Sequence, residues 1–146
     1  MNRIVIGADH GGFEYKKAII EHLEKKDYEV IDVGTFSSES VDYPDIAQEL
    51  AKIVINDNIP GILICGTGIG ISIAANKCKG IRAALCHDEF SARMTKKHND
   101  SNVLAMGQRV IGIGLALSIV DTWLDSEFEG GRHGKRIEKM MNLEEL

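Results

Sequence analysis

Short β-branched apolar runs alternate with longer amphipathic stretches along this sequence, and the alternation restricts the possible folds more than any other feature. Runs of this length and composition are typical of buried strands. We expect strands over Arg3–Gly7, Tyr28–Gly34, Gly61–Gly66, Ile81–Cys86 and Asn102–Gly107. A helical pattern follows each of them, which predicts a parallel sheet with helices on both faces.

The expected architecture is therefore α/β, a five-stranded, Rossmann-like three-layer sandwich built from a single domain over residues 1–146. The first helix is marked by apolar residues at helical spacing from Phe13 to Leu23, and Pro44 is placed to open the second. The later helices are expected over Asp45–Asn56, Ile69–Lys77, Asp88–His98, Gly112–Asp125 and Arg132–Leu146.

The last two helices raise the question of a partner subunit. Gly112–Asp125 is apolar nearly all round, which fits either a subunit interface or a core helix. Gly130 and Gly131 form a hinge-like pair before Arg132–Leu146, so we expect that final helix to pack on a second subunit.

Charge and cysteine content exclude several classes of protein. The formal net charge of −5 argues against a general nucleic-acid surface, although a local basic cluster could still bind an anionic ligand. The three cysteines form neither a disulfide framework nor a CxxC zinc motif. The apolar run at the N-terminus is too short for a signal peptide or a membrane span. We expect a cytoplasmic protein without a metal.

A glycine-rich turn, Gly66-Thr67-Gly68-Ile69-Gly70, follows the third strand, and we call residues 66–70 the glycine loop. Its spacing fits neither the dinucleotide fingerprint G-x-G-x-x-G nor a P-loop. Its backbone N–H groups can still converge on an anion at a helix N-terminus. That anion is either a bound phosphate or a charge that develops during a reaction.

Cys65 stands directly before the glycine loop, at the end of a strand. A helix N-terminus and converging N–H groups favour the thiolate form of cysteine, which could act as nucleophile, general base or redox group. Cys78 and Cys86 have no such setting, and we interpret them as small buried hydrophobic residues.

Ligands of open parallel sheets bind beyond the carboxyl ends of the strands. The residues at these ends are Asp9, His10, Asp32, Cys65, His87, Asp88, Gly107, Gln108 and Arg109. Asp9 alone is equally well explained as a helix cap. His98 and Asn99 lie between a helix and the fifth strand. A histidine there can either interact favourably with the helix dipole or belong to a functional site.

Arg132 and Arg136 are four residues apart and therefore share one face of the last helix. Cations in the first turns of a helix oppose its dipole, so a purely structural design would place acids there. Two arginines at a helix N-terminus favour binding of a phosphate dianion.

The segments "GADHGG", "DYPD", "CGTGIGISIAANK", "KKHNDSNVLAMGQR" and "GGRHGKR" together resemble the type B ribose-5-phosphate isomerase family and its galactose-6-phosphate isomerase relatives. The resemblance covers nearly the whole chain, with the motifs in matching order. It implies an aldose–ketose isomerase acting on a sugar phosphate without metal or organic cofactor. It also implies a homodimer with active sites shared between subunits, and leaves a tetramer open.

The same resemblance implies roles for individual residues. Cys65 would be the base that moves a proton between C2 and C1, and His98 the acid that opens the furanose ring, assisted by Thr67. The enediolate oxygen would be bound by Gly66, Gly68, Ile69 and Gly70. The sugar hydroxyls would be bound by Asp9, His10 and Asn99. The phosphate would be bound by Arg109, Arg132 and Arg136, with help from His10.

Some family members carry serine in place of this cysteine and a glutamate base a few residues later. Here Ile73, Ala74 and Ala75 offer no carboxylate, so the chain resembles the cysteine-base branch. Two other functions stay open. One is isomerisation of a hexose 6-phosphate, such as allose or galactose 6-phosphate. The other is a non-catalytic module that senses a phosphate ligand.

Overall fold

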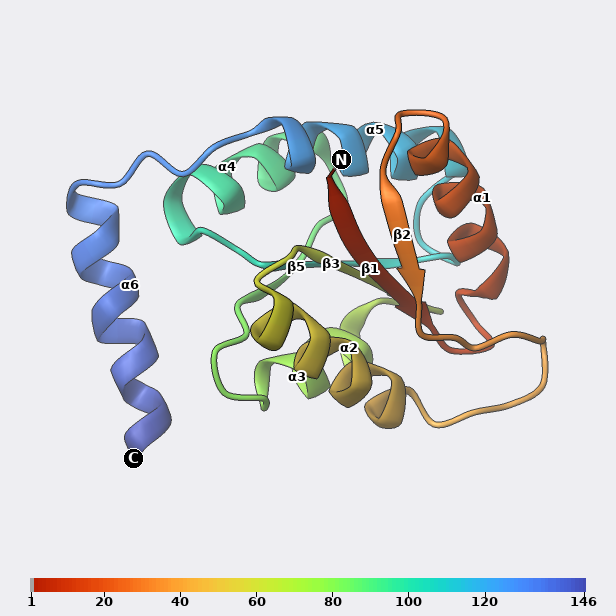
Figure 1. Ribbon diagram of the computed structural model, residues 1–146, viewed down its shortest axis with the longest axis horizontal. Helices are drawn as coiled ribbons and strands as arrows, with labels where there is room; N and C mark the ends of the chain where they lie inside the picture. The colour runs from red at the N-terminus through yellow and green to blue at the C-terminus, as the bar shows by residue number, and fades with distance from the viewer. Residues whose placement is uncertain (1) are drawn as a thin grey trace.

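The computed structural model describes residues 2–146, and in them five strands form one parallel sheet (Figure 1). The strands are β1 Arg3–Ala8, β2 Glu29–Asp32, β3 Gly61–Cys65, β4 Ala83–Leu85 and β5 Val103–Gly107. Their order in the sheet is β2-β1-β3-β5-β4. The chain therefore places β2 on one side of β1 and the three later strands on the other. The switch point between β1 and β3 is where ligands of such sheets bind.

Helices cover both faces of this sheet, which confirms the predicted α/β architecture (Figure 1). They are α1 Phe13–Glu24, α2 Tyr43–Asp57, α3 Ile69–Asn76, α4 Glu89–Asn99, α5 Ile113–Asp125 and α6 Arg132–Asn142. α1, α4 and α5 lie on one face, and α2 and α3 on the other.

Two helix boundaries differ from the prediction by more than one residue. The last helix ends at Asn142 instead of Leu146, and Leu143–Glu145 form a 3₁₀ turn. The last carbonyls of an α-helix have no partner within the helix, and a final 3₁₀ turn, with bonds three residues apart, satisfies some of them. α2 begins at Tyr43, before Asp45, because Pro44 is itself within the first turn.

Alternate side chains of each strand supply two separate cores. Ile4 and Ile6 of β1 pack toward α1 and α5, whereas Val5 packs toward α2 and α3. Trp123 and its neighbours on α5 are fully buried in the first core, so α5 is a core helix. Cys86 is also buried there, and burial raises the pKa of its thiol to about 11, which fits the expected hydrophobic role.

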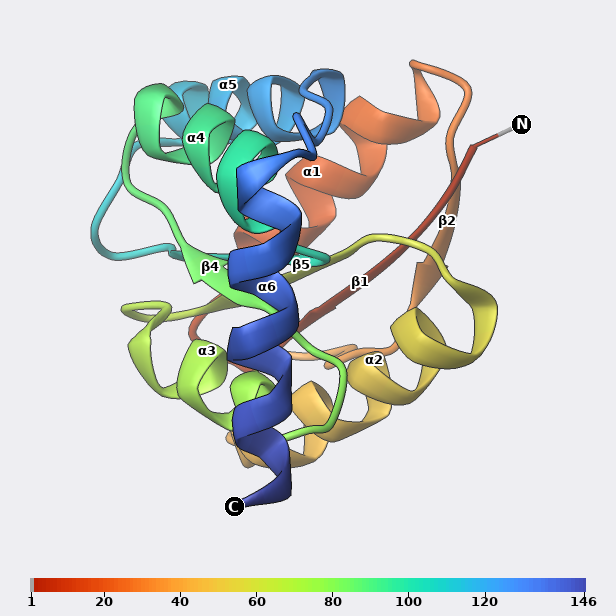
Figure 2. The same cartoon turned by 90° about the vertical axis from the view of Figure 1, so that its left-hand side faces the viewer.

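α6 lies apart from the two helical layers. It runs along the β4 side of the molecule, from the layer of α4 toward the layer of α3 (Figure 2). His133 is buried, whereas Arg132 and Arg136 are exposed. Packing of this helix on a second subunit stays a prediction.

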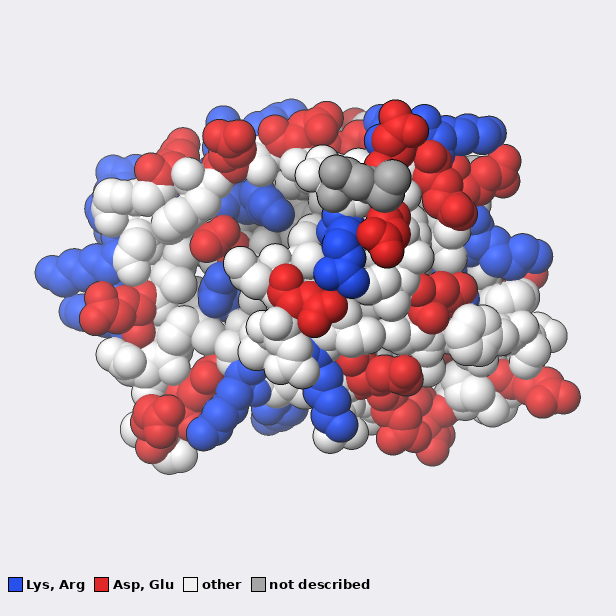
Figure 3. Space-filling view, viewed as in Figure 1, with Lys and Arg blue, Asp and Glu red and all other residues white. Residues whose placement is uncertain are grey.

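The face of the molecule seen in Figure 3 carries acidic and basic groups side by side. This mixture is that of an ordinary solvated face. Within residues 2–146, no helix combines the length and the apolar character that a bilayer crossing requires.

Candidate active site

The carboxyl ends of β1, β3 and β5 bring three predicted site residues to one edge of the sheet, which we call the carboxyl edge. Ala8 pairs with Ile64 across β1 and β3, and Cys65 pairs with Gly107 across β3 and β5. Asp9, Cys65 and Arg109 therefore lie at or just after the carboxyl ends of neighbouring strands. This placement agrees with the expectation from the sequence.

The glycine loop directs a backbone donor at the thiol. The N–H of Gly68 donates to Cys65 Sγ over 3.0 Å, and Cys65 is only 5% exposed. A hydrogen bond of this kind stabilises an anionic sulfur more than a neutral one. Gly68 has φ +80°, and a Cβ there would lie 2.6 Å from Leu85 Cδ1. Glycine is therefore required at this position by both backbone conformation and space.

The loop after β5 fastens the glycine loop from the other side. The N–H of Gln108 donates to the Cys65 carbonyl over 2.9 Å, and the N–H of Arg109 donates to the Gly66 carbonyl over 2.9 Å. A Cβ on Gly66 would lie 3.5 Å from Arg109 Cδ. The arginine side chain thus lies beside the opening of the glycine loop, close enough to bind an anion held there.

Asp9 and His10 complete the carboxyl edge. Asp9 is 7% exposed, and its Oδ1 accepts the N–H of Gly11 over 2.9 Å. The N-cap of α1 is Gly12, without a side-chain cap bond, so Asp9 closes a local turn instead of capping the helix. His10 is exposed, and its Nδ1 accepts the N–H of Val41 over 3.2 Å. That bond leaves Nε2 free to donate to a ligand.

Tyr43 is a candidate site residue to which the sequence analysis gave no role. A Cβ on Gly70 would lie 2.7 Å from Tyr43 Cζ and 3.0 Å from its Oη, so the phenol stands against the glycine loop. Its side chain is partly open to solvent, at 39% exposure. The available signal was the aromatic residue in "DYPD", directly before the proline that opens α2.

Asp32, also at the carboxyl edge, is structural. Both of its carboxylate oxygens accept from Lys16 Nζ, at 2.6 and 2.8 Å, and the lysine side chain is 2% exposed. Oδ1 also accepts the N–H of Gly34 over 2.9 Å. A buried lysine needs such a partner. The pair anchors the start of the β2–α2 loop, and this loop contains Val41, whose N–H donates to His10.

A second group of predicted site residues lies where α4 ends and α6 begins. His98, near the end of α4, stacks on His133 with ring centroids 4.2 Å apart and an interplanar angle of 11°. Glu129 Oε1 lies 3.6 Å from His98 Nε2 and 3.3 Å from His133 Nε2. Burial, followed by the charges of His98 and Arg132, lowers the pKa of His133. This shift favours the neutral form of His133.

The two groups lie at opposite ends of the strands, the first at their carboxyl ends and the second near their amino ends. α4 starts beyond the carboxyl end of β4 and runs back, so His98 and Asn99 lie near the start of β5, whereas Cys65 and Arg109 lie near its end. The five residues of β5 alone span roughly 16 Å. One small ligand cannot contact both groups within a single chain.

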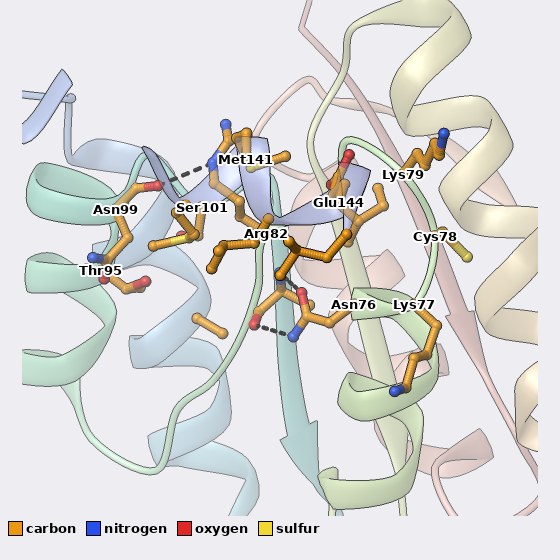
Figure 4. Close-up of a pocket in the computed structure, with 16 residues that line it drawn as sticks. Asn76, Lys77, Cys78, Lys79, Arg82, Thr95, Asn99, Ser101, Met141 and Glu144 are labelled. Atoms are coloured by element: carbon orange, nitrogen blue, oxygen red, sulfur yellow. Dashed lines mark hydrogen bonds between the residues drawn. The ribbon is translucent and has the colours of Figure 1, made fainter. Parts of the chain in front are cut away.

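Arg82 connects the elements that carry the second group (Figure 4). Its Nε donates to the carbonyls of Asn99 and Asp100, both over 3.1 Å, and its Nη2 donates to the Asp100 carbonyl over 2.8 Å. Its Nη1 lies 3.6 Å from Met141 Sδ on α6. These bonds satisfy carbonyls at the end of α4, and they tie that end to α6.

Arg82 also lines a cavity of about 860 Å³ between α6 and the α3–β4 connection (Figure 4). Asn99 borders this cavity, but Cys65 and the glycine loop do not. This cavity therefore lies beneath α6, and it is separate from the residues of the carboxyl edge.

Sequence comparison places the chain in a family. The model of the ribose/galactose isomerase family matches residues 4–140. This chain belongs to the ribose/galactose isomerase family. The resemblance inferred from the motifs is thereby confirmed.

Members of the ribose/galactose isomerase family align with the chain over nearly its full length. Ribose-5-phosphate isomerase B of Escherichia coli is 51% identical over 146 residues, covering 99% of this chain and 98% of the relative. A structure of the Clostridium thermocellum ribose-5-phosphate isomerase B has a TM-score of 0.96 at 55% identity, covering 98% of this chain and 97% of the other. The Mycoplasma genitalium enzyme with bound ribulose-5-phosphate has a TM-score of 0.95 at 42% identity, covering 98% and 96%.

Proposed function

We propose that this chain interconverts ribose 5-phosphate and ribulose 5-phosphate. The observation that carries the proposal is the Gly68 N–H, 3.0 Å from Cys65 Sγ, at the mouth of a glycine loop on the switch point of the sheet. This arrangement provides a base beside donors for a developing oxyanion. The relatives from Escherichia coli and Clostridium thermocellum, both called ribose-5-phosphate isomerase B, support the choice of substrate.

The proton transfer uses the carboxyl edge. The Cys65 thiolate removes the proton from C2 of the open-chain aldose, and the electrons of that bond form the C1–C2 double bond of a cis-enediolate. The former carbonyl oxygen on C1 takes up negative charge, which N–H groups of residues 66–70 stabilise by about 3 kcal/mol for each donor. Cys65 returns the proton to C1, the proton of the C2 hydroxyl passes to the negative oxygen on C1, and the ketose results with its carbonyl on C2 and a hydroxyl on C1.

Ring opening and phosphate binding combine the second group with residues of the carboxyl edge. Sugar phosphates are largely cyclic in water, so an acid must first protonate the ring oxygen. His98 has this role in the proposal, with Thr67 assisting, because histidine titrates near neutral pH. The phosphate is held by Arg109, Arg132 and Arg136, and the hydroxyls by Asp9, His10 and Asn99. Binding energy from the phosphate fixes C1 and C2 against Cys65.

Since the two groups lie at opposite edges, the proposal requires a second copy of the chain. In a homodimer, the carboxyl edge of one subunit meets the α4–α6 region of the other. The exposed apolar side chains of Ile69 and Ile73, 50% and 56% accessible, support such a contact beside the glycine loop. The three cysteines are all free, which is consistent with a reducing cytoplasm as the place of the reaction.

The direct test is to incubate the purified protein with ribose 5-phosphate and follow the ketose by NMR. Formation of ribulose 5-phosphate supports the proposal, and a non-catalytic sensing module predicts no turnover. Because the family model covers galactose isomerases too, the same assay should be run with allose and galactose 6-phosphates. A higher kcat/KM for a hexose phosphate than for ribose 5-phosphate would identify the hexose phosphate as the preferred substrate.

A further inference from the structure

We propose that His98, Glu129 and His133 form a binding site for a divalent cation of the zinc class, and that a cation bound there inhibits the isomerase by occupying His98. The binding stands on the geometry alone. The inhibition rests on the proposed role of His98. The sequence offers no zinc motif at this place, because the three ligands come from α4, the α5–α6 connection and α6.

Two of the three separations between the donor atoms already match those of such a site. Tetrahedral zinc with bonds of about 2.1 Å to imidazole nitrogen and carboxylate oxygen separates its donors by about 3.4 Å. Glu129 Oε1 lies 3.3 Å from His133 Nε2 and 3.6 Å from His98 Nε2. In residues 2–146 this is the one cluster whose three donor atoms all lie within 4.8 Å of one another.

The remaining adjustment falls on the freer residue. His133 is 8% exposed and fixed by packing, whereas His98 is 40% exposed and has room to tilt its ring toward the shared carboxylate. The connection is held as well, since the N–H of Glu129 donates to the Lys97 carbonyl over 3.1 Å. Two histidines and one glutamate leave a fourth position for water, as in open zinc sites.

Arg132 and Arg136 work against the cation. Both lie on the first turns of α6 beside His133, where their charge disfavours a further positive group. Affinity should therefore be weaker than that of structural zinc sites. It should follow the order of transition metals for nitrogen ligands, with Cu²⁺ above Zn²⁺ and Mg²⁺ without effect.

Binding is tested with Co²⁺ as a spectroscopic probe in the Cys65→Ala variant, so that this thiolate cannot ligate. We expect a d–d absorption typical of four-coordinate cobalt, displaced by Zn²⁺ and without a sulfur charge-transfer band. His133→Asn and Glu129→Gln should each weaken binding at least about tenfold. His22→Asn is the matched control, because His22 Nε2 also pairs with a carboxylate, Asp121 Oδ1, at 2.8 Å but without a third donor.

Absence of the cobalt signal, or equal binding in His133→Asn, overturns the site. Inhibition is then measured as ketose formation against free Zn²⁺ in the wild-type chain and in His22→Asn. The proposal expects half-inhibition near the dissociation constant from the cobalt competition, for both proteins. Binding without inhibition overturns the proposal that the cation inhibits the isomerase, and with it the assignment of His98 as the acid. Isomerisation of ribose 5-phosphate would still establish the proposed reaction.

Discussion

The backbone N–H of Gly68 donates to the sulfur of Cys65, three residues earlier, over 3.0 Å. A single turn of chain thus positions both the thiol and a group that stabilises its anion. The same turn starts α3, and the dipole at the N-terminus of this helix also favours negative charge nearby.

Replacing Cys65 by alanine should abolish isomerisation while phosphate binding persists. Loss of a general base costs about 10²- to 10⁴-fold in rate. Turnover is measured by NMR, and binding of a phosphate analogue by calorimetry. Cys78→Ala is the control, since that thiol lies in the α3–β4 region and should leave kcat unchanged. Near-normal turnover in Cys65→Ala would remove this residue as the base.

The three thiols should differ in their reaction with iodoacetamide at pH 8. Burial raises the pKa of Cys86 to about 11, so roughly one thiol in a thousand is ionised at that pH, and burial also raises the pKa of Cys78. We expect the first alkylated peptide in mass spectrometry to contain Cys65, with loss of activity in parallel. Protection by ribose 5-phosphate should slow both. Faster labelling of Cys86 would contradict this order.

Gly68→Ala should lower both stability and activity. The substitution places a Cβ at φ +80°, 2.6 Å from Leu85 Cδ1 and 2.7 Å from the Met106 carbonyl carbon, at a cost of about 1–3 kcal/mol. Gly114→Ala, in α5 with no atom within 4 Å of the new Cβ, should instead stabilise by up to about 1 kcal/mol. Thermal unfolding of both variants measures the contrast. Equal Tm shifts would speak against strain in the glycine loop.

Mixing two inactive variants should restore activity if sites are shared between subunits. In a hybrid of Cys65→Ala and His98→Asn chains, one of the two sites keeps both wild-type residues. Random pairing gives hybrids in half of the dimers, so about a quarter of the wild-type sites return. The measurement is kcat after refolding an equimolar mixture. No recovery, with hybrids present by native mass spectrometry, would place both residues in one subunit's site.

Arg82→Met should impair catalysis without unfolding the chain. It removes the bonds to the carbonyls of Asn99 and Asp100, so the end of α4 loses the contact that orients His98. Misplacement of a catalytic group commonly costs about 10- to 100-fold, so we expect that loss in kcat, with partial rescue by Arg82→Lys. Arg3→Met, which breaks exposed ion pairs, is the control. Unchanged kcat with unchanged Tm would exclude a positioning role.

Much of the fold follows from the sequence because strands and helices have different hydrophobic periods. The order β2-β1-β3-β5-β4 does not, because strand pairing is set by contacts far apart in the chain. The same reason explains the site. Asp9, Cys65 and Arg109 were placed together by the rule for strand ends, and the structure confirms that placement.

Other features required the tertiary structure. The contact of Tyr43 with Gly70 depends on how α2 packs on α3, and the role of Asp32 depends on the buried Lys16. The separation of His98 from Cys65 follows from the return direction of α4. The individual catalytic roles, the single domain and the shared dimeric site stay predictions.

The position of His98 at one edge and Cys65 at the other has a consequence for the chain as it is made. If the active site is shared in the proposed dimer, a newly made monomer carries both groups of site residues but cannot bring them to one ligand, so it is inactive. Turnover at low expression would then rise with the square of chain concentration. Gene dosage, and not only enzyme chemistry, would set when the sugar phosphate pool begins to equilibrate.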